Sequence, residues 1–147
     1  MTHFERLGLP VRFAVEPTEL ERGFLAASRT VHPDHHVGGQ NDTAAVNAAY
    51  HTLRDPVRRA EYLLELRPGP TTGAAPVADP VFLMEMMAER ERAEAGDTTV
   101  AADLAARLAG LLTELGRQFA AADDPAVRRT LATAKTVRSL LRQVASD

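Results

Sequence analysis

The segment His32-Pro33-Asp34-His35-His36 decides how the rest of the chain is read. Proline holds φ at about −65° and disfavours the helical conformation in the residue before it. A helix that arrives through residues 29–31 should therefore end near His32. We expect a corner at which Asp34 faces solvent. A carboxylate at such a corner is either a turn residue or a contact for a partner, and the surrounding sequence has to decide between the two.

The residues before this corner have the pattern of an amphipathic helix. Pro17 suits the first helical position, and Glu19 lies in the first turn, where the helix dipole stabilises a negative charge. Apolar side chains then recur at helical spacing and predict one buried stripe of Leu20, Phe24, Ala27 and Val31. Arg22 and Arg29 fall on the opposite, solvated side. Gly23 disfavours the helix by about 1 kcal/mol relative to alanine, so tertiary packing has to hold it.

A second helix is predicted after the loop at residues 37–41. Asn41 or Asp42 caps it, and it runs to about Arg54. Its expected inner face consists of Val46, Ala49, Tyr50 and Leu53. Two helices joined by a loop of this length lie antiparallel, so they form a hairpin with the His-Pro-Asp segment at its tip.

Two further features complete the N-terminal half. Asp55 and Pro56 start a helix over residues 57–66, and three of its side chains can close the base of the hairpin: Tyr62, Leu63 and Leu66. Residues 67–78 are rich in proline and glycine and have no period, which is typical of a linker. The first domain therefore covers residues 1–66.

Residues 79–147 predict a three-helix bundle. Asp79 and Pro80 open the first helix, which is apolar nearly all round over residues 81–87 and must be covered on more than one face. The second helix carries a stripe of Leu104, Leu108, Leu111, Leu115 and Phe119. Asp124 and Pro125 start the third, with a stripe of Val127, Leu131, Ala134, Val137 or Arg138, Leu141 and Val144. Without a strand pattern, the predicted fold is all-α.

Composition narrows the function. The 147 residues include no cysteine, which excludes disulfides, thiolate metal ligands and cysteine nucleophiles. The net charge of −3 does not suggest nucleic-acid binding. Because no apolar run could span a bilayer and the N-terminus has no secretory pattern, we expect a cytoplasmic protein. Lys135-Thr136 lacks the preceding glycines of a phosphate-binding loop, and no serine lies in a nucleophile elbow. We therefore expect neither an enzyme nor a cofactor.

Two charged clusters remain. His32, Asp34, His35 and His36 offer four metal ligands in five residues, but no second segment has a ligand motif, so we expect no metal site. The last helix carries basic residues without an acid from Pro125 to Ser146, which is typical of a solvated face but could also dock an acidic protein surface: Arg128, Arg129, Lys135, Arg138 and Arg142.

Three blocks of sequence resemble a known family. The run NAAYHTLRDPVRRAEYLL at residues 47–64, placed after His-Pro-Asp, resembles the HscB family of J-domain co-chaperones. The opening Phe4 with LGLP at residues 7–10 and the segment FLME at residues 82–85 are also similar to that family. The resemblance implies an N-terminal J domain, which is a helical hairpin with a His-Pro-Asp loop, followed by the C-terminal bundle.

The resemblance also implies one partner for each domain. The J domain would stimulate the ATPase of a DnaK-type, HscA-like chaperone, with His32, Pro33 and Asp34 as the triggering loop and with Arg22 and Arg29 against an acidic surface. An arginine of the chaperone would pair with Asp34. A charged hydrogen bond of this kind contributes about 1.5–3 kcal/mol, and the basic rim steers the encounter.

The bundle would bind the IscU-like scaffold protein on which iron-sulfur clusters are assembled. The family positions for this contact correspond to Leu83, Met84, Met87 and Glu91. The sequence departs from the family in carrying His35 where J domains commonly have lysine, and in having no aromatic residue in 131–134. Two other interpretations stay open, a general J-domain protein with a different client and a histidine-based metal-binding protein.

Overall fold

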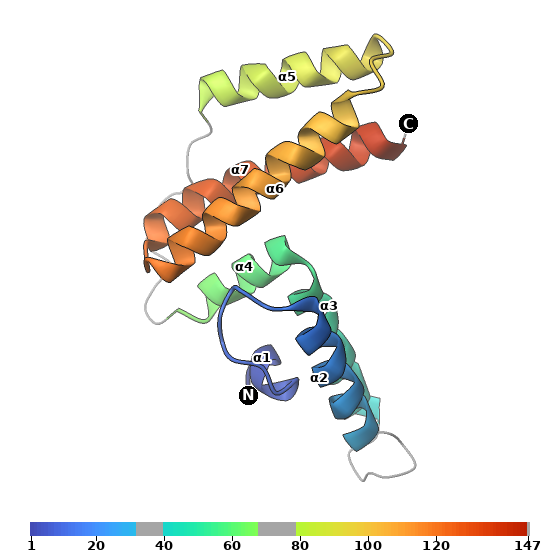
Figure 1. Cartoon of the computed structure of the whole chain (residues 1–147), viewed down its shortest axis with the longest axis vertical. Coiled ribbons are helices and arrows are strands. Elements are labelled where there is room, and N and C mark those ends of the chain that lie inside the picture. Colours follow the sequence, from blue (N-terminus) through green and yellow to red (C-terminus); the bar gives the residue numbers. More distant parts are fainter. Residues whose placement is uncertain (32–39, 68–78, 147) are drawn as a thin grey trace. The chain divides into compact units, whose positions relative to one another are not determined.

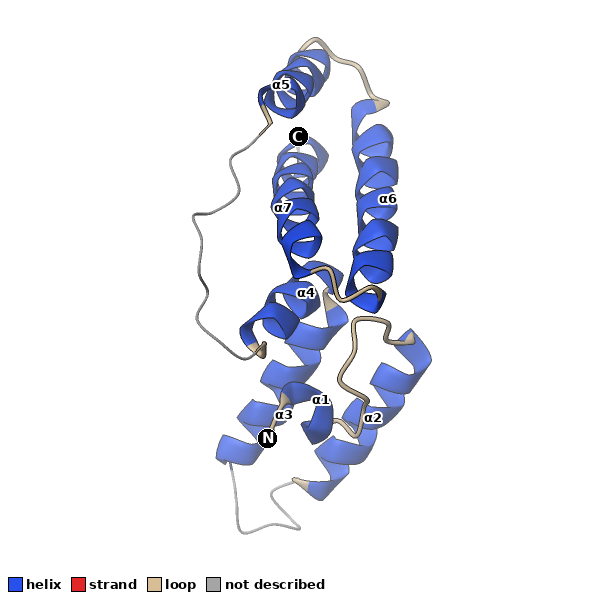
Figure 2. Cartoon of the chain, turned by 90° about the vertical axis from the view of Figure 1, so that its left-hand side faces the viewer, coloured by secondary structure: helices blue, strands red, loops and turns tan. Residues whose placement is uncertain are grey.

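The computed structural model describes residues 1–31, 40–67 and 79–146, and these ranges contain helices and no strand (Figures 1 and 2). The helices are α1 (His3–Arg6), α2 (Pro17–Thr30), α3 (Gln40–Arg54), α4 (Pro56–Glu65), α5 (Pro80–Glu94), α6 (Val100–Ala120) and α7 (Asp124–Ser146). The all-α prediction is confirmed. The predicted corner at His32, Pro33 and Asp34 and most of the predicted linker lie outside the described residues. The chain divides into two compact units, Met1–Arg67 and Pro68–Asp147.

The first unit is built around α3, which lies side by side with α2 (Figures 1 and 2). Val46, Ala49 and Leu53 of α3 are buried, as predicted. The other buried apolar side chains of this unit are Phe4, Leu7, Phe13, Leu20, Val57, Ala60 and Leu63. The core therefore combines side chains of all four helices with Leu7 and Phe13 from the segment between α1 and α2.

Two details of the predicted core are wrong. On α2 only Leu20 is buried, whereas the rest of the predicted stripe is half-buried. The reason is that Phe24 packs at the edge of the helix pair, where its ring stacks on Tyr50 with centroids 4.2 Å apart. Leu66 is exposed because α4 ends one residue before it. Tyr62, by contrast, helps to hold the N-terminus, because its hydroxyl accepts a hydrogen bond of 2.9 Å from the backbone N–H of His3.

Gly23 has a steric role in α2. A Cβ atom placed there would lie 2.3 Å from the carbonyl oxygen of Leu7, which is closer than any real contact. The end of α1 therefore passes directly over α2, and only glycine leaves room for it. This close approach explains why the helix contains a residue that lowers its own propensity.

In the second unit, α6 and α7 run alongside each other and α5 lies across them (Figures 1 and 2). The core cluster consists of Phe82, Met86, Val100, Leu104, Val137 and Leu140. On α7 the buried stripe passes through Leu140, whereas the predicted Leu141 is only half-buried. Two of the predicted caps are present, since Asp55 accepts from the N–H of Val57 at 2.9 Å and Asp79 from that of Val81 at 3.0 Å.

The start of α7 is one residue earlier than predicted. Asp124 is already helical, and the carboxylate of Asp123 accepts the hydrogen bond from the N–H of Ala126 at 3.2 Å. Asp123 therefore takes the capping role that the sequence pattern had suggested for Asp124. Across the parts of the chain that the structure describes, no helix has the length and apolar character needed to cross a membrane.

Candidate functional site

The first candidate surface is the basic face of α2, formed by Arg22 and Arg29. Both side chains are exposed, and at about 100° per residue they lie about 20° apart around the helix, opposite the buried Leu20. Neither forms an ion pair within the described residues. Leu25 lies between them on the same side and is also exposed. Sequence reasoning missed Leu25, although an apolar residue three and four positions from two arginines is a detectable signal.

Contacts between α2 and α3 hold the helix ends that flank residues 32–39 in the sequence. The hydroxyl of Thr43 donates to the carbonyl oxygen of Val31 at 3.2 Å, which ties the first turn of α3 to the end of α2. Further along, the hydroxyl of Tyr50 donates to the carboxylate of Glu21. That hydrogen bond is the main reason why the pKa of Tyr50 is raised. Hydrogen bonds from Thr43 and from Tyr50 therefore join α3 to α2 at two separate points along the helices.

Arg59 supports the other end of the hairpin. Among the described residues of the first unit it is the charged side chain that is buried, and its Nη1 donates to the carbonyl oxygen of Leu53 at 2.6 Å. Its guanidinium lies over the ring of Phe13, 4.9 Å from the centroid. Burial lowers the pKa of Arg59. These contacts join the start of α4 to the end of α3 and to the segment before α2, so Arg59 is a structural residue.

The second candidate surface is the outer face of α5, which we define as Val81, Leu83, Met84, Met87 and Glu91. Their exposed fractions are 62% for Val81, 43% for Leu83, 70% for Met84 and 63% for Met87, and Glu91 is also exposed. These side chains project from the side of α5 that faces away from the core. Such a run of apolar side chains in water is characteristic of a protein-binding surface. Sequence reasoning missed Val81.

Phe82 and Met86 anchor the opposite side of α5. They are only 8% and 6% exposed. One apolar side of α5 therefore packs in the core, whereas the other apolar side is the exposed outer face. Arg107 of α6 covers Phe82 at 5.3 Å and pairs with Glu85 at 2.7 Å. On α7, Leu131 and Ala134 belong to the core, so residues 131–134 present no exposed bulky apolar side chain.

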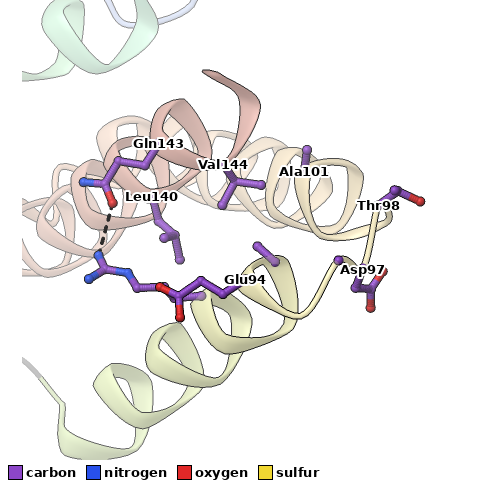
Figure 3. A pocket seen from close by; sticks show the side chains of 10 residues that line it. Glu94, Asp97, Thr98, Ala101, Leu140, Gln143 and Val144 are labelled. Atoms are coloured by element: carbon purple, nitrogen blue, oxygen red, sulfur yellow. Dashed lines mark hydrogen bonds between the residues drawn. The ribbon is translucent and has the colours of Figure 1, made fainter. Parts of the chain in front are cut away.

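The remaining candidate sites are a cavity in the second unit and the histidine-rich segment. A cavity of about 450 Å³ lies between the second half of α5 and the ends of α6 and α7, with Leu140 and Val144 among its lining residues (Figure 3). Arg90 bridges its edge by donating to Gln143 at 3.2 Å. Within residues 1–31, 40–67 and 79–146, no group of three acidic or histidine side chains could hold a metal ion. His32, Asp34, His35 and His36 lie outside these ranges.

Comparisons with known proteins agree with this arrangement. A co-chaperone protein HscB homolog from Burkholderia thailandensis is 39% identical over 124 residues, which cover 78% of this chain and 69% of the relative. A homolog of the same name from Vibrio cholerae serotype O1 is 37% identical over 125 residues, with 78% and 71% covered. No family model matches the chain.

Two solved structures are similar along nearly the whole chain. Chaperone HscB from Vibrio cholerae has a TM-score of 0.79 and 31% identity, with 99% of this chain and 96% of that chain covered. Human co-chaperone protein HscB has a TM-score of 0.84 at 22% identity, with 99% and 81% covered, and supports the fold. An all-α J-domain co-chaperone is the class that these features define. The chain belongs to the HscB family, which confirms the resemblance seen in the sequence.

Proposed function

We propose that this chain stimulates the ATPase of a DnaK-type chaperone and delivers to it the scaffold protein on which iron-sulfur clusters are assembled. The observation that carries the proposal is the presence, in one chain of the HscB family, of an exposed basic face on α2 and an exposed apolar face on α5. The first suits an acidic surface and the second suits an apolar one. The chain then acts as an adaptor, and the catalysis takes place in its partner.

The first unit contacts the chaperone in this proposal. His32, Pro33 and Asp34 follow α2 and its C-cap Val31 in the sequence and form the trigger, with Asp34 pairing with an arginine of the chaperone. Arg22 and Arg29 steer the encounter, because complementary charges accelerate association and fix orientation. Leu25 adds an apolar contact at the edge of that basic face.

The second unit carries the scaffold. Leu83, Met84 and Met87 present apolar surface that gains free energy when a partner covers it, at roughly 25 cal/mol for each Å². Methionine side chains are flexible and polarisable, so they adapt to an uneven partner surface. Glu91, which is exposed one turn further along, supplies a charge at the rim. The buried Leu131 and Ala134 leave α5 as the main contact.

The proposal is tested by single-turnover ATP hydrolysis of an HscA-like chaperone with this chain, with an IscU-like scaffold, and with both. We expect each protein to stimulate hydrolysis and the two together to act synergistically. Asp34→Asn should abolish stimulation without lowering thermal stability, and Leu83→Ser with Met87→Ser should remove the synergy but keep the stimulation by the chain alone. No stimulation by the wild-type chain would refute the first half. Stimulation without any scaffold dependence would instead indicate a general J-domain protein with another client.

A further inference from the structure

The way α5 is attached determines where its outer face points. Phe82 and Met86 are buried in the first two turns, but the later α5 residue that packs against the core is the small, partly buried Ala93. Beneath this second half lies the cavity lined by Leu140 and Val144 (Figure 3). Apolar packing therefore fixes the start of α5 and leaves the position of its end to polar contacts.

Arg92 makes most of those polar contacts. Its guanidinium donates to Glu89 on α5 at 2.8 Å and to Asp97 in the connecting turn at 2.9 Å. The same group donates to Thr99 and to Asp103 at the start of α6, both at 3.2 Å. One side chain thus joins α5, the turn and α6.

The turn is built around the same residues. The N–H of Asp97 donates to the carbonyl oxygen of Arg92 at 3.0 Å, and Gly96 provides the left-handed backbone with φ of +95°. The carboxylate of Asp97 accepts from the N–H of Thr99 at 2.8 Å and from its hydroxyl at 2.6 Å. These bonds from Thr99, followed by the one from Arg92, lower the pKa of Asp97 to about 2.

The other ties of α5 are simpler. Arg90 meets Gln143 through one hydrogen bond, and Glu85 pairs with Arg107 in the first half of the helix. Isolated exposed pairs hold a geometry weakly, whereas several acceptors around one guanidinium form a network that resists rearrangement. The corner between α5 and α6 is therefore the point at which the direction of α5 is set.

We infer that Arg92 is a positioning residue for partner binding, which locks the angle between α5 and α6 and so directs the outer face of α5 toward the scaffold. The inference rests on the proposed function, because that face is the proposed scaffold site. Arg92 itself is engaged at the corner and does not need to touch the partner. Substituting Arg92 should let α5 move relative to α6 without changing any of the side chains that are proposed to contact the scaffold.

The geometry is tested by a distance between two spin labels, which can be placed freely because the chain has no cysteine. Ala88→Cys on α5 and Ser139→Cys on α7 are exposed sites for these labels. We expect a narrow distance distribution in the doubly labelled chain without further substitution, and a broadened one after Arg92→Gln. Arg90→Gln is the matched comparison, since it makes the same charge change two residues away but removes only the single hydrogen bond to Gln143, and it should broaden the distribution much less than Arg92→Gln. A distribution that stays narrow after Arg92→Gln would overturn the inference.

The functional consequence is measured by calorimetric titration of the unlabelled chain with the scaffold. Arg92→Gln should weaken binding roughly three- to tenfold, and Arg92→Lys should be intermediate because an ammonium cannot reach all four acceptors at once. Arg90→Gln should stay within about twofold of the wild type. If Arg92→Gln broadens the distance distribution but does not lower the affinity for the scaffold, the role of Arg92 in positioning the binding face is overturned, whereas its role in fixing α5 stands. A wild-type chain that does not bind the scaffold would refute the proposed function, and that result is seen before any substitution is made.

Discussion

Helices α2 and α5 have similar lengths, and each carries a proposed partner surface, but they do so in opposite ways. α2 is amphipathic: its inner side buries Leu20, and its outer side carries Arg22 and Arg29. α5 is apolar on both sides, with Met86 buried and Met87, the next residue, 63% exposed. Exposed arginines are well hydrated without a partner, whereas exposed methionines leave apolar surface in water.

Because of this difference, the two surfaces should respond to different perturbations. A charged face acts mainly on the rate and orientation of the encounter, and salt screens it. An apolar face contributes through burial, so truncating its side chains should raise the dissociation rate. Experiments that compare neighbouring residues on each helix can therefore separate stability from binding.

Two adjacent methionines should give the greatest difference in the free energy of unfolding. Met86→Ala should lower the free energy of unfolding by about 2–4 kcal/mol, because it leaves a cavity in the core cluster. Met87→Ala should change it by less than about 0.5 kcal/mol, because its side chain is already in water. Urea unfolding followed by circular dichroism measures both. Equal losses would mean that α5 has no outer face, and the comparison with α2 would fail.

A second contrast uses two helical glycines. Gly23→Ala should destabilise the chain by about 1–3 kcal/mol despite the better helix propensity of alanine, because the new methyl group meets the carbonyl of Leu7. Gly110→Ala on α6 has nothing within 4 Å of the added atom and should stabilise the chain by about 0.5–1 kcal/mol. The same unfolding experiment gives both values. A stabilising Gly23→Ala would show that α1 does not press on α2.

Sequence patterns predicted the helices well and their boundaries with other elements less well. The proline and aspartate signals at residues 55–56 and 79–80 located two helix starts, because capping is a local interaction. Asp124 misled by one residue, because Asp123 offers the same carboxylate and only the backbone geometry chooses between them. The apolar pattern of residues 81–87 predicted cover on more than one face, whereas the structure buries Phe82 and Met86 and leaves Met84 and Met87 exposed.

What the sequence could not show depends on distant contacts. Nothing local indicates that Gly23 faces the carbonyl of Leu7, or that Arg92 collects acceptors from three segments. The exposure of Leu25 and Val81 was missed because apolar residues are assigned to the core by default. The contacts of Gly23 and Arg92 became visible only when the neighbouring helices were in place.

A third prediction concerns the charged surface of α2. Arg22→Gln with Arg29→Gln should slow association with the DnaK-type chaperone roughly tenfold at low salt, and the difference should shrink as ionic strength rises. Arg129→Gln with Arg142→Gln on α7 makes the same change of charge at two other exposed positions and should have little effect. Stopped-flow fluorescence at several salt concentrations measures the rates. An identical slowing by both pairs would mean that the face of α2 has no special role, and that total charge or the basic face of α7 steers the encounter.

The smallest effect is expected in the turn between α6 and α7, which belongs to neither surface. Ala122 has a φ of +55°, a left-handed conformation that disfavours residues with a Cβ atom. Ala122→Gly should therefore raise the free energy of unfolding by about 0.5–1 kcal/mol, whereas Ala121→Gly, with a φ of −83°, should not. Because this change adds stability without touching α2 or α5, chaperone stimulation and scaffold affinity should stay constant. A change in either would show that binding follows global stability, and the separation of the two surfaces would then need another explanation.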